Sequence, residues 1–293
     1  MVTDWIKVRL PVGVHVDRMR SILRKRKLVT VCEEAHCPNI AECWETTATF
    51  MLMGPVCTRG CKFCAVTSGK PGLLDKDEPE KLAEAIAEMD LDYAVLTSVN
   101  RDDIPDGGAT HFAACIIAIR EARPDTLVEV LIPDYLGAPL QSIIVARPVV
   151  IAHNLETVER LQSVVRDRRA GYARSLTVLR QVKEKNPAIY TKSSLMVGLG
   201  ETEEEVTDAL HALRQAGVDI VTIGQYLRPS QWHLPVQKYY HPVEFKQIEE
   251  TAKELGFVFS ACGPLVRSSY RAGELFIKNI VKGGMYEENS SHV

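Results

Sequence analysis

The segment C57-T-R-G-C-K-F-C64 sets three cysteines in a C-x3-C-x2-C pattern. Three thiolates at this spacing can hold three corners of a [4Fe–4S] cluster, which is ligated by cysteine sulfur. The fourth iron is left without a protein ligand, and an open position on a metal centre is where a small molecule can bind and react. Phe63 would place an aromatic ring beside the open iron. The segment therefore predicts a reactive metal centre on Cys57, Cys61 and Cys64.

A second cysteine triad, Cys32, Cys37 and Cys43, follows a C-x4-C-x5-C pattern. These residues could hold a second cluster, serve as structural thiols, or join the first triad at one zinc or cluster. A zinc knuckle needs four ligands, usually in paired C-x2-C steps, which the three-and-two spacing of the first triad does not fit. Six of the eight cysteines lie between residues 32 and 64, and disulfides are rare in a reducing cytosol. An iron–sulfur cluster is therefore favoured over a zinc knuckle, and ligand cysteines are favoured over disulfides.

The bulk composition excludes several classes of protein. The 293 residues include 35 Lys and Arg against 38 Asp and Glu, a formal net charge of −3, which gives no reason to expect nucleic acid as a partner. The first residues, M1-V-T-D-W-I-K7, lack the apolar run of a signal peptide, and no segment approaches the roughly 20 apolar residues of a membrane span. We expect a cytoplasmic protein without membrane contact, and the sequence leaves its oligomeric state open.

Short apolar strands alternate with amphipathic helices along the chain, which predicts an α/β fold with a parallel sheet. The expected strands cover residues 50–53, 93–98, 127–132, 149–152, 194–197, 219–223 and 257–260. The expected helices cover 78–89, 111–122, a short segment near 140, 155–161, 176–185, 201–215 and 243–255. Six such units up to residue 223 are too few for a full eight-stranded barrel and favour a partial, open (β/α)6 barrel.

Polar or glycine-rich blocks follow five of the expected strands. They contain Cys57, Asp106, Asn154, Gly198 and Gln225. Active groups of parallel α/β folds lie at the carboxyl ends of the strands, so we expect these blocks to meet at one mouth of the barrel.

The chain resembles the radical S-adenosylmethionine (SAM) enzymes, whose signature is C-x3-C-x-aromatic-C, and within them the lipoyl synthase family. The segments that carry the resemblance are V31-C-E-E-A-H-C-P-N-I-A-E-C-W44, D106-G-G108, H153-N-L-E-T-V158, V197-G-L-G-E-T202, Q225-Y-L-R-P-S230 and R267-S-S-Y-R271. They extend over nearly the whole chain.

The resemblance implies two [4Fe–4S] clusters and SAM as cofactors. Cys57, Cys61 and Cys64 would hold the radical SAM cluster. Cys32, Cys37, Cys43 and the second serine of R-S-S-Y, Ser269, would hold an auxiliary cluster; taken without the resemblance, Ser268 and Ser269 could be ordinary turn residues. Residues 1–45 would form an N-terminal extension, 46–261 the radical SAM barrel, and 262–293 a C-terminal extension.

The implied activity is that of a sulfurtransferase. It would insert two sulfur atoms at C6 and C8 of a protein-bound octanoyl-lysine to give lipoyl-lysine, with the auxiliary cluster as sulfur donor. Its partners would be an octanoylated lipoyl-carrier protein or domain, an electron donor such as ferredoxin or flavodoxin, and an iron–sulfur carrier for cluster repair. Two alternatives remain: another radical SAM sulfur transferase, biotin-synthase-like or a methylthiotransferase, and a non-enzymatic electron carrier with two clusters.

Five residues are candidates for contacts with SAM: Phe63, Asn154, Gly198, Gly200 and Gln225. The two glycines would allow a ligand near backbone N–H groups at a helix N-terminus, although a tight turn would also explain them. Asn154 could hydrogen-bond the ribose or the carboxylate, or form an Asx turn or helix cap. The charged run 167–169 is expected to be a solvated loop.

Overall fold

Seven parallel strands form the central sheet, and each lies beside the next in chain order, β1-β4-β5-β6-β7-β8-β9. The computed structural model describes residues 4–6, 14–35, 37, 39–44 and 48–269. The strands are β1 (Ala48–Leu52), β4 (Tyr93–Ser98), β5 (Leu127–Leu131), β6 (Val150–Ala152), β7 (Tyr190–Val197), β8 (Ile220–Gln225) and β9 (Phe259–Gly263). The edges of the sheet are β1 and β9, so the expected partial (β/α)6 barrel is confirmed, with β9 as a seventh strand.

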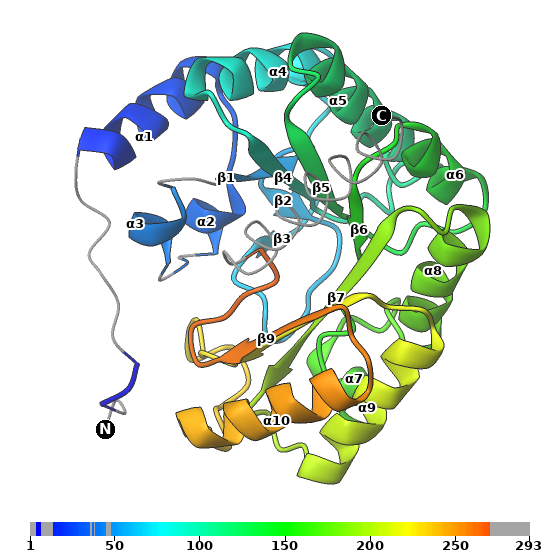
Figure 1. The fold of residues 1–293 in the computed structure, drawn as a ribbon. Coiled ribbons are helices and arrows are strands. Elements are labelled where there is room, and N and C mark those ends of the chain that lie inside the picture. The colour runs from blue at the N-terminus through cyan, green and yellow to red at the C-terminus, as the bar shows by residue number, and fades with distance from the viewer. Residues whose placement is uncertain (1–3, 7–13, 36, 38, 45–47, 270–293) are drawn as a thin grey trace, which may run out of the picture.

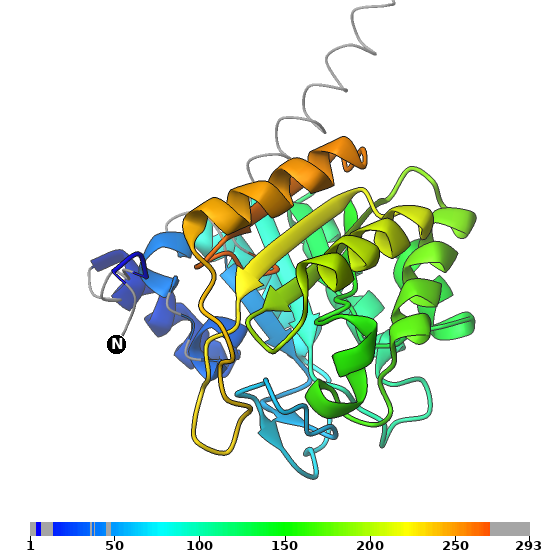
Figure 2. The same cartoon turned by 90° about the horizontal axis from the view of Figure 1, so that it is seen from below.

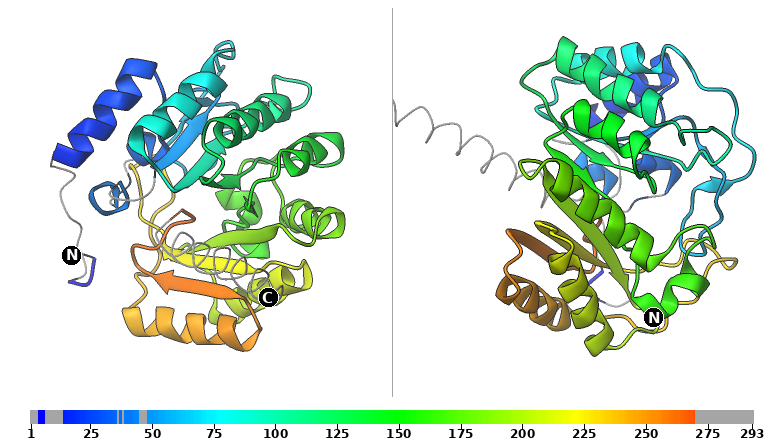
Figure 3. Two further views of the ribbon diagram at one scale, coloured as in Figure 1. Left: turned by 45° about the horizontal axis from the view of Figure 1, so that its top comes forward. Right: turned by 90° about the vertical axis from the view of Figure 1, so that its right-hand side faces the viewer.

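Helices cover the outer face of the sheet (Figures 1 and 3). They are α4 (Glu78–Met89), α5 (Ala109–Ala122), α6 (Ala138–Val145), α8 (Tyr172–Lys185), α9 (Glu203–Gln215) and α10 (Pro242–Glu254). Each buries an apolar stripe; in α4, Leu82, Ala85 and Ile86 are fully buried. This i, i+3, i+4 spacing is why α4 lies where the sequence predicts it.

The prediction of a helix over residues 155–161 is wrong. Glu156 has a positive φ of 70° and forms an isolated β-bridge to Leu195 of β7, with its N–H donating to the Ser194 carbonyl at 3.0 Å. A 3₁₀ turn (Glu159–Leu161) and the short helix α7 (Gln162–Val165) follow. Pairing with a neighbouring strand overrides helical spacing here, and Glu156 consequently faces the barrel mouth.

The N-terminal part of the chain packs on the barrel and does not stand apart from it. Helix α1 (Val14–Arg26) lies against α4, where Arg26 pairs with Glu84 and Glu88. Between α1 and α2 (Val31–Glu34), the carbonyl of Val29 accepts a hydrogen bond of 2.8 Å from Met51 of β1. The segment that carries Cys32 is therefore fixed at the edge of the sheet.

A buried ion pair crosses the barrel interior. Lys192 Nζ lies 2.7 Å from Glu129 Oε1, and the hydroxyl of Tyr93 donates to Glu129 Oε2 at 2.5 Å. All three residues are about 1% exposed, so the charges of Lys192 and Glu129 are paired away from water. In the part of the chain that the structure describes, no helix is both long and apolar enough to cross a bilayer.

Candidate active site

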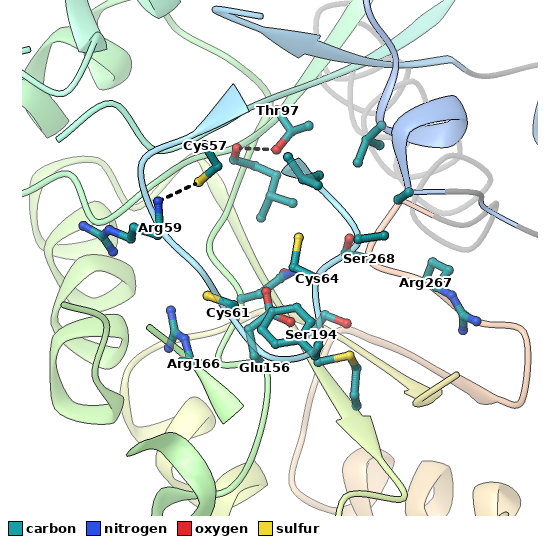
Figure 4. Close-up of a pocket in the computed structure, with 18 of the residues that line it drawn as sticks. Cys57, Arg59, Cys61, Cys64, Thr97, Glu156, Arg166, Ser194, Arg267 and Ser268 are labelled. Atoms are coloured by element: carbon teal, nitrogen blue, oxygen red, sulfur yellow. Dashed lines mark hydrogen bonds between the residues drawn. The ribbon is translucent and has the colours of Figure 1, made fainter. Parts of the chain in front are cut away.

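A cavity of about 610 Å³ opens at the carboxyl ends of the strands (Figure 4). Its wall includes Thr97 of β4, Leu131 of β5, Ser194 of β7 and Gly224 of β8. Cys57, Cys61 and Cys64 line it, as do Cys37 and Ser268 from the two flanking segments. Segments far apart in the sequence thus bring Cys37 and the first triad to one cavity. Of the five strand-end residues expected to meet there, Cys57, Asn154 and Gln225 line the cavity, whereas Asp106 and Gly198 do not.

The first triad lies on a loop that leaves β1. Its short strand β2 (Val56–Cys57) pairs with β3 (Thr67–Ser68) and closes the loop at its base. The Cys57 sulfur accepts hydrogen bonds from the backbone N–H groups of Arg59 (3.4 Å) and Asn100 (3.3 Å). Donors of this kind stabilise negative charge on sulfur and influence the potential of an iron–sulfur cluster.

Burial disfavours the ionised form of two thiols in this loop. Burial raises the pKa of Cys64 to about 12, with smaller contributions in the same direction from Cys61 and Glu156. Burial also raises the pKa of Cys61. A metal ion reverses this preference, because a thiol that binds one is deprotonated outright. Three partly buried thiols facing one cavity therefore fit a [4Fe–4S] cluster with one open iron.

The charged run 167–169 is only partly the solvated loop that we expected: Arg168 and Arg169 are exposed, but Asp167 is held against the cysteine loop. The Asp167 N–H donates to the Cys61 sulfur at 3.3 Å, and the Asp167 carboxylate accepts from the Gly60 N–H at 3.0 Å. Arg169 bonds the Asp167 carboxylate at 2.8 Å and donates to the Thr58 carbonyl at 2.7 Å. This stretch therefore holds the cysteine loop from one side.

The second triad meets the C-terminal segment beside the cavity. Burial raises the pKa of Cys32 to about 11, with a further rise from neighbouring Cys37. The side-chain amide of Asn39 donates to the Leu265 carbonyl at 2.7 Å. Arg267 is partly buried near Cys37, and its positive charge opposes the effect of burial on the Cys37 thiol, whose pKa is still raised.

Cys43, the third member of the second triad, is also buried, and its N–H donates to the Asn39 carbonyl at 2.9 Å. Of the two serines that follow Arg267, Ser268 lines the cavity. Ser269, the candidate fourth ligand, is the next residue and is partly buried. Arg271, in the same motif, lies outside the described residues.

Asn154 and Phe63 both line the cavity, as expected of residues that contact a cofactor. Asn154 Oδ1 is buried and has no hydrogen-bond partner within the described residues, so it is available to a ligand. Glu156, which the sequence analysis missed, lines the same wall; burial raises its pKa although Arg166 and a hydrogen bond from Asn154 oppose the rise. Its place beside Asn154 depends on the strand pairing that replaced the expected helix.

Gln225 lines the cavity, whereas Gly198 and Gly200 do not. The Gln225 amide donates to the Lys238 carbonyl at 3.0 Å, and its oxygen accepts from the Tyr240 N–H at 2.9 Å. Gly198 has φ +106°, and a Cβ there would lie 2.2 Å from Gln225 Nε2. The N–H of Gly198 is taken by the Glu201 carboxylate.

The glycines do not open the next helix, contrary to our expectation. Helix α9 begins at Glu203, and Thr202 caps it with a capping box to Glu205. The glycines instead form the turn that lets Gln225 hold the loop after β8. The block V197-G-L-G-E201 therefore acts on the cavity through packing.

A buried polar network that the sequence did not reveal joins the cysteine loop to β5 and β6. Arg59 pairs with Asp134, and with Asp102 at 2.8 Å, while His153 Nε2 lies 3.3 Å from Asp134 Oδ1. Burial alone would raise the pKa of Asp134, but bonding to His153 and Arg59 outweighs it and holds the pKa below its usual range. The network fixes the orientation of the loop that carries Cys57 and Cys61.

Comparison with known families agrees with this geometry. A model of the radical SAM superfamily matches residues 51–213, and a model of the N-terminal domain of lipoyl synthase in the same superfamily matches residues 1–37. A lipoyl synthase of Myxococcus xanthus is 55% identical over 282 residues, which cover 95% of each chain. A lipoyl synthase of Picrophilus torridus is 57% identical over 275 residues, covering 93% of this chain and 95% of that protein.

Solved structures that resemble the model share its fold at low sequence identity. The hydrogenase maturase HydG of Carboxydothermus hydrogenoformans superposes with a TM-score of 0.55 at 15% identity, over 93% of this chain and 72% of that one. SuiB of Streptococcus suis, solved with S-adenosylmethionine, superposes with a TM-score of 0.58 at 10% identity, over 85% of this chain. The chain spans 55% of the length of SuiB.

Proposed function

The chain belongs to the lipoyl synthase family of the radical SAM superfamily, and from this premise we propose how its residues divide the work of the reaction. The reaction is the insertion of two sulfur atoms at C6 and C8 of a protein-bound octanoyl-lysine, giving lipoyl-lysine. When bound, the clusters and SAM supply the difficult chemistry, a 5′-deoxyadenosyl radical that abstracts hydrogen and a source of sulfur. The relatives do not favour the biotin-synthase-like, methylthiotransferase or electron-carrier alternatives.

Cys57, Cys61 and Cys64 would hold the radical SAM cluster. Backbone N–H groups donate to the sulfurs of Cys57 and Cys61, and the stretch around Asp167 fixes their loop. All three sulfur-bearing residues line the cavity, so the open iron would face it.

Asn154, Glu156 and Phe63 would contact SAM. The unpartnered Asn154 oxygen can accept from a hydroxyl or amino group, and Glu156 offers a carboxylate beside it. Phe63 supplies an apolar surface that excludes water. Gln225, with Gly198 and Gly200 behind it, would keep the loop after β8 against this pocket.

The auxiliary cluster would join the two extensions, residues 1–45 and 262–293, across the mouth of the barrel formed by 46–261. Its ligands would be Cys32, Cys37, Cys43 and Ser269. The hydrogen bond from Asn39 to Leu265 and the position of the Arg267 charge near Cys37 support this assignment, because both join the two extensions. A serine oxygen is a harder ligand than thiolate, so its iron would be lost more easily when sulfur leaves.

The proposed partners follow from the reaction. An octanoylated carrier protein or domain supplies the substrate, a ferredoxin or flavodoxin supplies electrons, and an iron–sulfur carrier rebuilds the auxiliary cluster. We infer a cytoplasmic location, because six reduced cysteines that serve as ligands need a compartment in which thiols persist.

The observation that carries this proposal is the opening of Cys37 and the Cys57–Cys64 loop into one cavity. The test is anaerobic turnover of an octanoylated carrier domain, with mass spectrometry of the product and chromatography of 5′-deoxyadenosine. Wild type should add two sulfur atoms. Cys37→Ala should still cleave SAM but add none. Failure of the wild type to thiolate the domain would refute the function, and thiolation by Cys37→Ala would refute the auxiliary role of Cys37.

A further inference from the structure

The Cys61–Cys64 loop has an outer side that faces away from the cavity. Two segments clamp this side. The N–H of Lys62 donates to the Val165 carbonyl at 2.8 Å, and the Lys62 carbonyl accepts from the Leu234 N–H at 3.2 Å. The loop after β8 and the loop that carries the cysteines consequently lie together at one end of the molecule (Figure 2). One layer of side chains separates the candidate cluster ligands from the surface there.

His233 links this layer directly to a cluster ligand. Its Nε2 lies 2.9 Å from the carbonyl oxygen of Cys64. Because a carbonyl oxygen only accepts, Nε2 carries the proton, which leaves Nδ1 to accept from the Ser230 hydroxyl at 2.8 Å. The His233 backbone is held as well, since its carbonyl accepts from Arg228 Nε at 2.9 Å. The imidazole is thus fixed on the outer side of Cys64.

Trp232 covers this histidine and is 58% exposed. The two rings meet edge to face, with centroids 5.0 Å apart. Lys62 Nζ lies 3.9 Å from the centroid of the Trp232 ring, a cation–π contact that holds the indole on the surface. Exposed tryptophan next to a fixed cation is typical of residues that anchor protein interfaces.

The segments around Trp232 are rich in positive charge although the whole chain is not. Residues 57–70, 163–170 and 226–240 contain eight lysine or arginine residues and one acid, Asp167. Three of the eight, Arg59, Arg169 and Lys238, pair with acids outside these segments and add no net charge to the surface. Asp167 is turned inward, with a side chain 12% exposed, whereas Lys62, Arg168 and Arg228 are exposed. Val164, 56% exposed, adds apolar area. Such a surface attracts an acidic partner.

We propose that the surface formed by Lys62, Val164, Arg168, Arg228 and Trp232 is the docking site of an acidic, low-potential one-electron carrier protein, whose electron enters through His233 and Cys64. The inference rests on the proposed function, which places a cluster on Cys64. The carrier loses one electron and the cluster gains it, changing from the 2+ to the 1+ state; no bond or proton is transferred. A carrier is favoured over the octanoylated domain because the octanoyl chain must enter the cavity on the other side of Cys64.

The test measures reduction of the cluster by stopped-flow bleaching of its visible absorbance. Reduced flavodoxin is the carrier probe, and dithionite is a small reductant that needs no docking. We expect Lys62→Glu, Arg168→Glu and Trp232→Ala each to raise the flavodoxin concentration for half-maximal rate by roughly tenfold. Dithionite reduction should stay at the wild-type rate. Lys246→Glu, on the exposed face of α10, is the matched control and should resemble wild type.

The electron route has its own pair of variants. His233→Gln keeps a donor to the Cys64 carbonyl and should keep the limiting rate at saturating flavodoxin, whereas His233→Leu should lower it without changing the half-saturating concentration. Equal limiting rates would exclude the route.

Wild-type half-saturation in all three surface variants would overturn the docking site. The docking site would also be overturned if the surface variants bound an octanoylated domain more weakly in calorimetry while their reduction by flavodoxin was unchanged. If Trp232→Ala also slows dithionite, its loop has been disturbed, and Arg168→Glu, outside that loop, decides the matter. Failure of the cluster assignment on which the inference rests would look different, since wild type would then show no bleaching by dithionite either. Failure of the proposed function would appear as absence of thiolation of the carrier domain.

Discussion

The backbone N–H of Asp167 donates a hydrogen bond to the Cys61 sulfur at 3.3 Å, across 106 residues of sequence. The carboxylate of the same residue holds the Gly60 N–H at 3.0 Å. One aspartate after β6 therefore fixes both the sulfur and the backbone of a loop that leaves β1. The geometry of the cysteine ligands depends on this distant contact as well as on their spacing.

Replacing Asp167 should make the radical SAM cluster easier to lose. Asp167→Ala removes the carboxylate that orients Gly60 and Arg169, and contacts of this kind typically change metal affinity by about 10–100-fold. We expect the cluster of Asp167→Ala to bleach at least roughly tenfold faster than wild type in excess chelator. Arg168→Ala, at the exposed neighbouring residue, should match wild type. Equal half-lives for all three proteins would show that the carboxylate does not support the loop.

The two serines of the R-S-S-Y motif can be separated by single substitutions. Ser269→Ala should lower the iron and sulfide content of the auxiliary cluster, because it removes the proposed oxygen ligand, while SAM cleavage persists. Ser268→Ala is the matched control and should keep both clusters. The reverse result would assign the ligand to Ser268, which lines the cavity.

Glu129→Gln should destabilise the barrel strongly. The substitution leaves the Lys192 charge buried without its counter-charge, a change that costs about 3–5 kcal/mol in comparable pairs. Urea unfolding of the cluster-free protein should show a lower midpoint with the same slope. The exposed pair Lys246–Glu250 offers a control, since Glu250→Gln should leave the midpoint unchanged. A wild-type midpoint for Glu129→Gln would mean that Lys192 is neutral or solvated.

Asp134 should stabilise the fold in a pH-dependent way. Its pKa is below the usual value in the folded state, so its contribution is present above the unfolded pKa of about 3.9 and is lost as pH falls toward the folded pKa. Asp134→Asn should therefore be less stable than wild type at pH 7, and the difference in free energy of unfolding should shrink below about pH 4. A gap that persists unchanged to pH 2 would rule out ionisation of Asp134 as its cause.

The sequence predicts the sheet well because its strands are short, buried and flanked by amphipathic helices. Residues 93–98 are nearly all buried, and their apolar run suffices to predict β4. The failures occur where tertiary contacts override local pattern. Residues 155–161 have helical spacing, yet Glu156 pairs with β7. Local spacing contains no information about that neighbour.

Some residues of the candidate site could likewise be predicted from the sequence, and others could not. The two cysteine triads are recognisable from their spacing, and the cavity contains members of both. Gly198 looked like part of a ligand-binding helix start, but its positive φ and its contact with Gln225 give it a packing role. Glu156 and Asp134 were missed because isolated acids have no local signature; a carboxylate directly after an expected strand was the only available signal.

The central claim is that two [4Fe–4S] clusters face one cavity, and anaerobic iron and sulfide analysis tests it most directly. Wild type should contain about eight irons and eight sulfides per chain, and each triple variant, Cys32/Cys37/Cys43→Ala or Cys57/Cys61/Cys64→Ala, about four of each. Only the first variant should still cleave SAM with dithionite. A wild type with four irons, or with zinc in place of iron, would contradict the account.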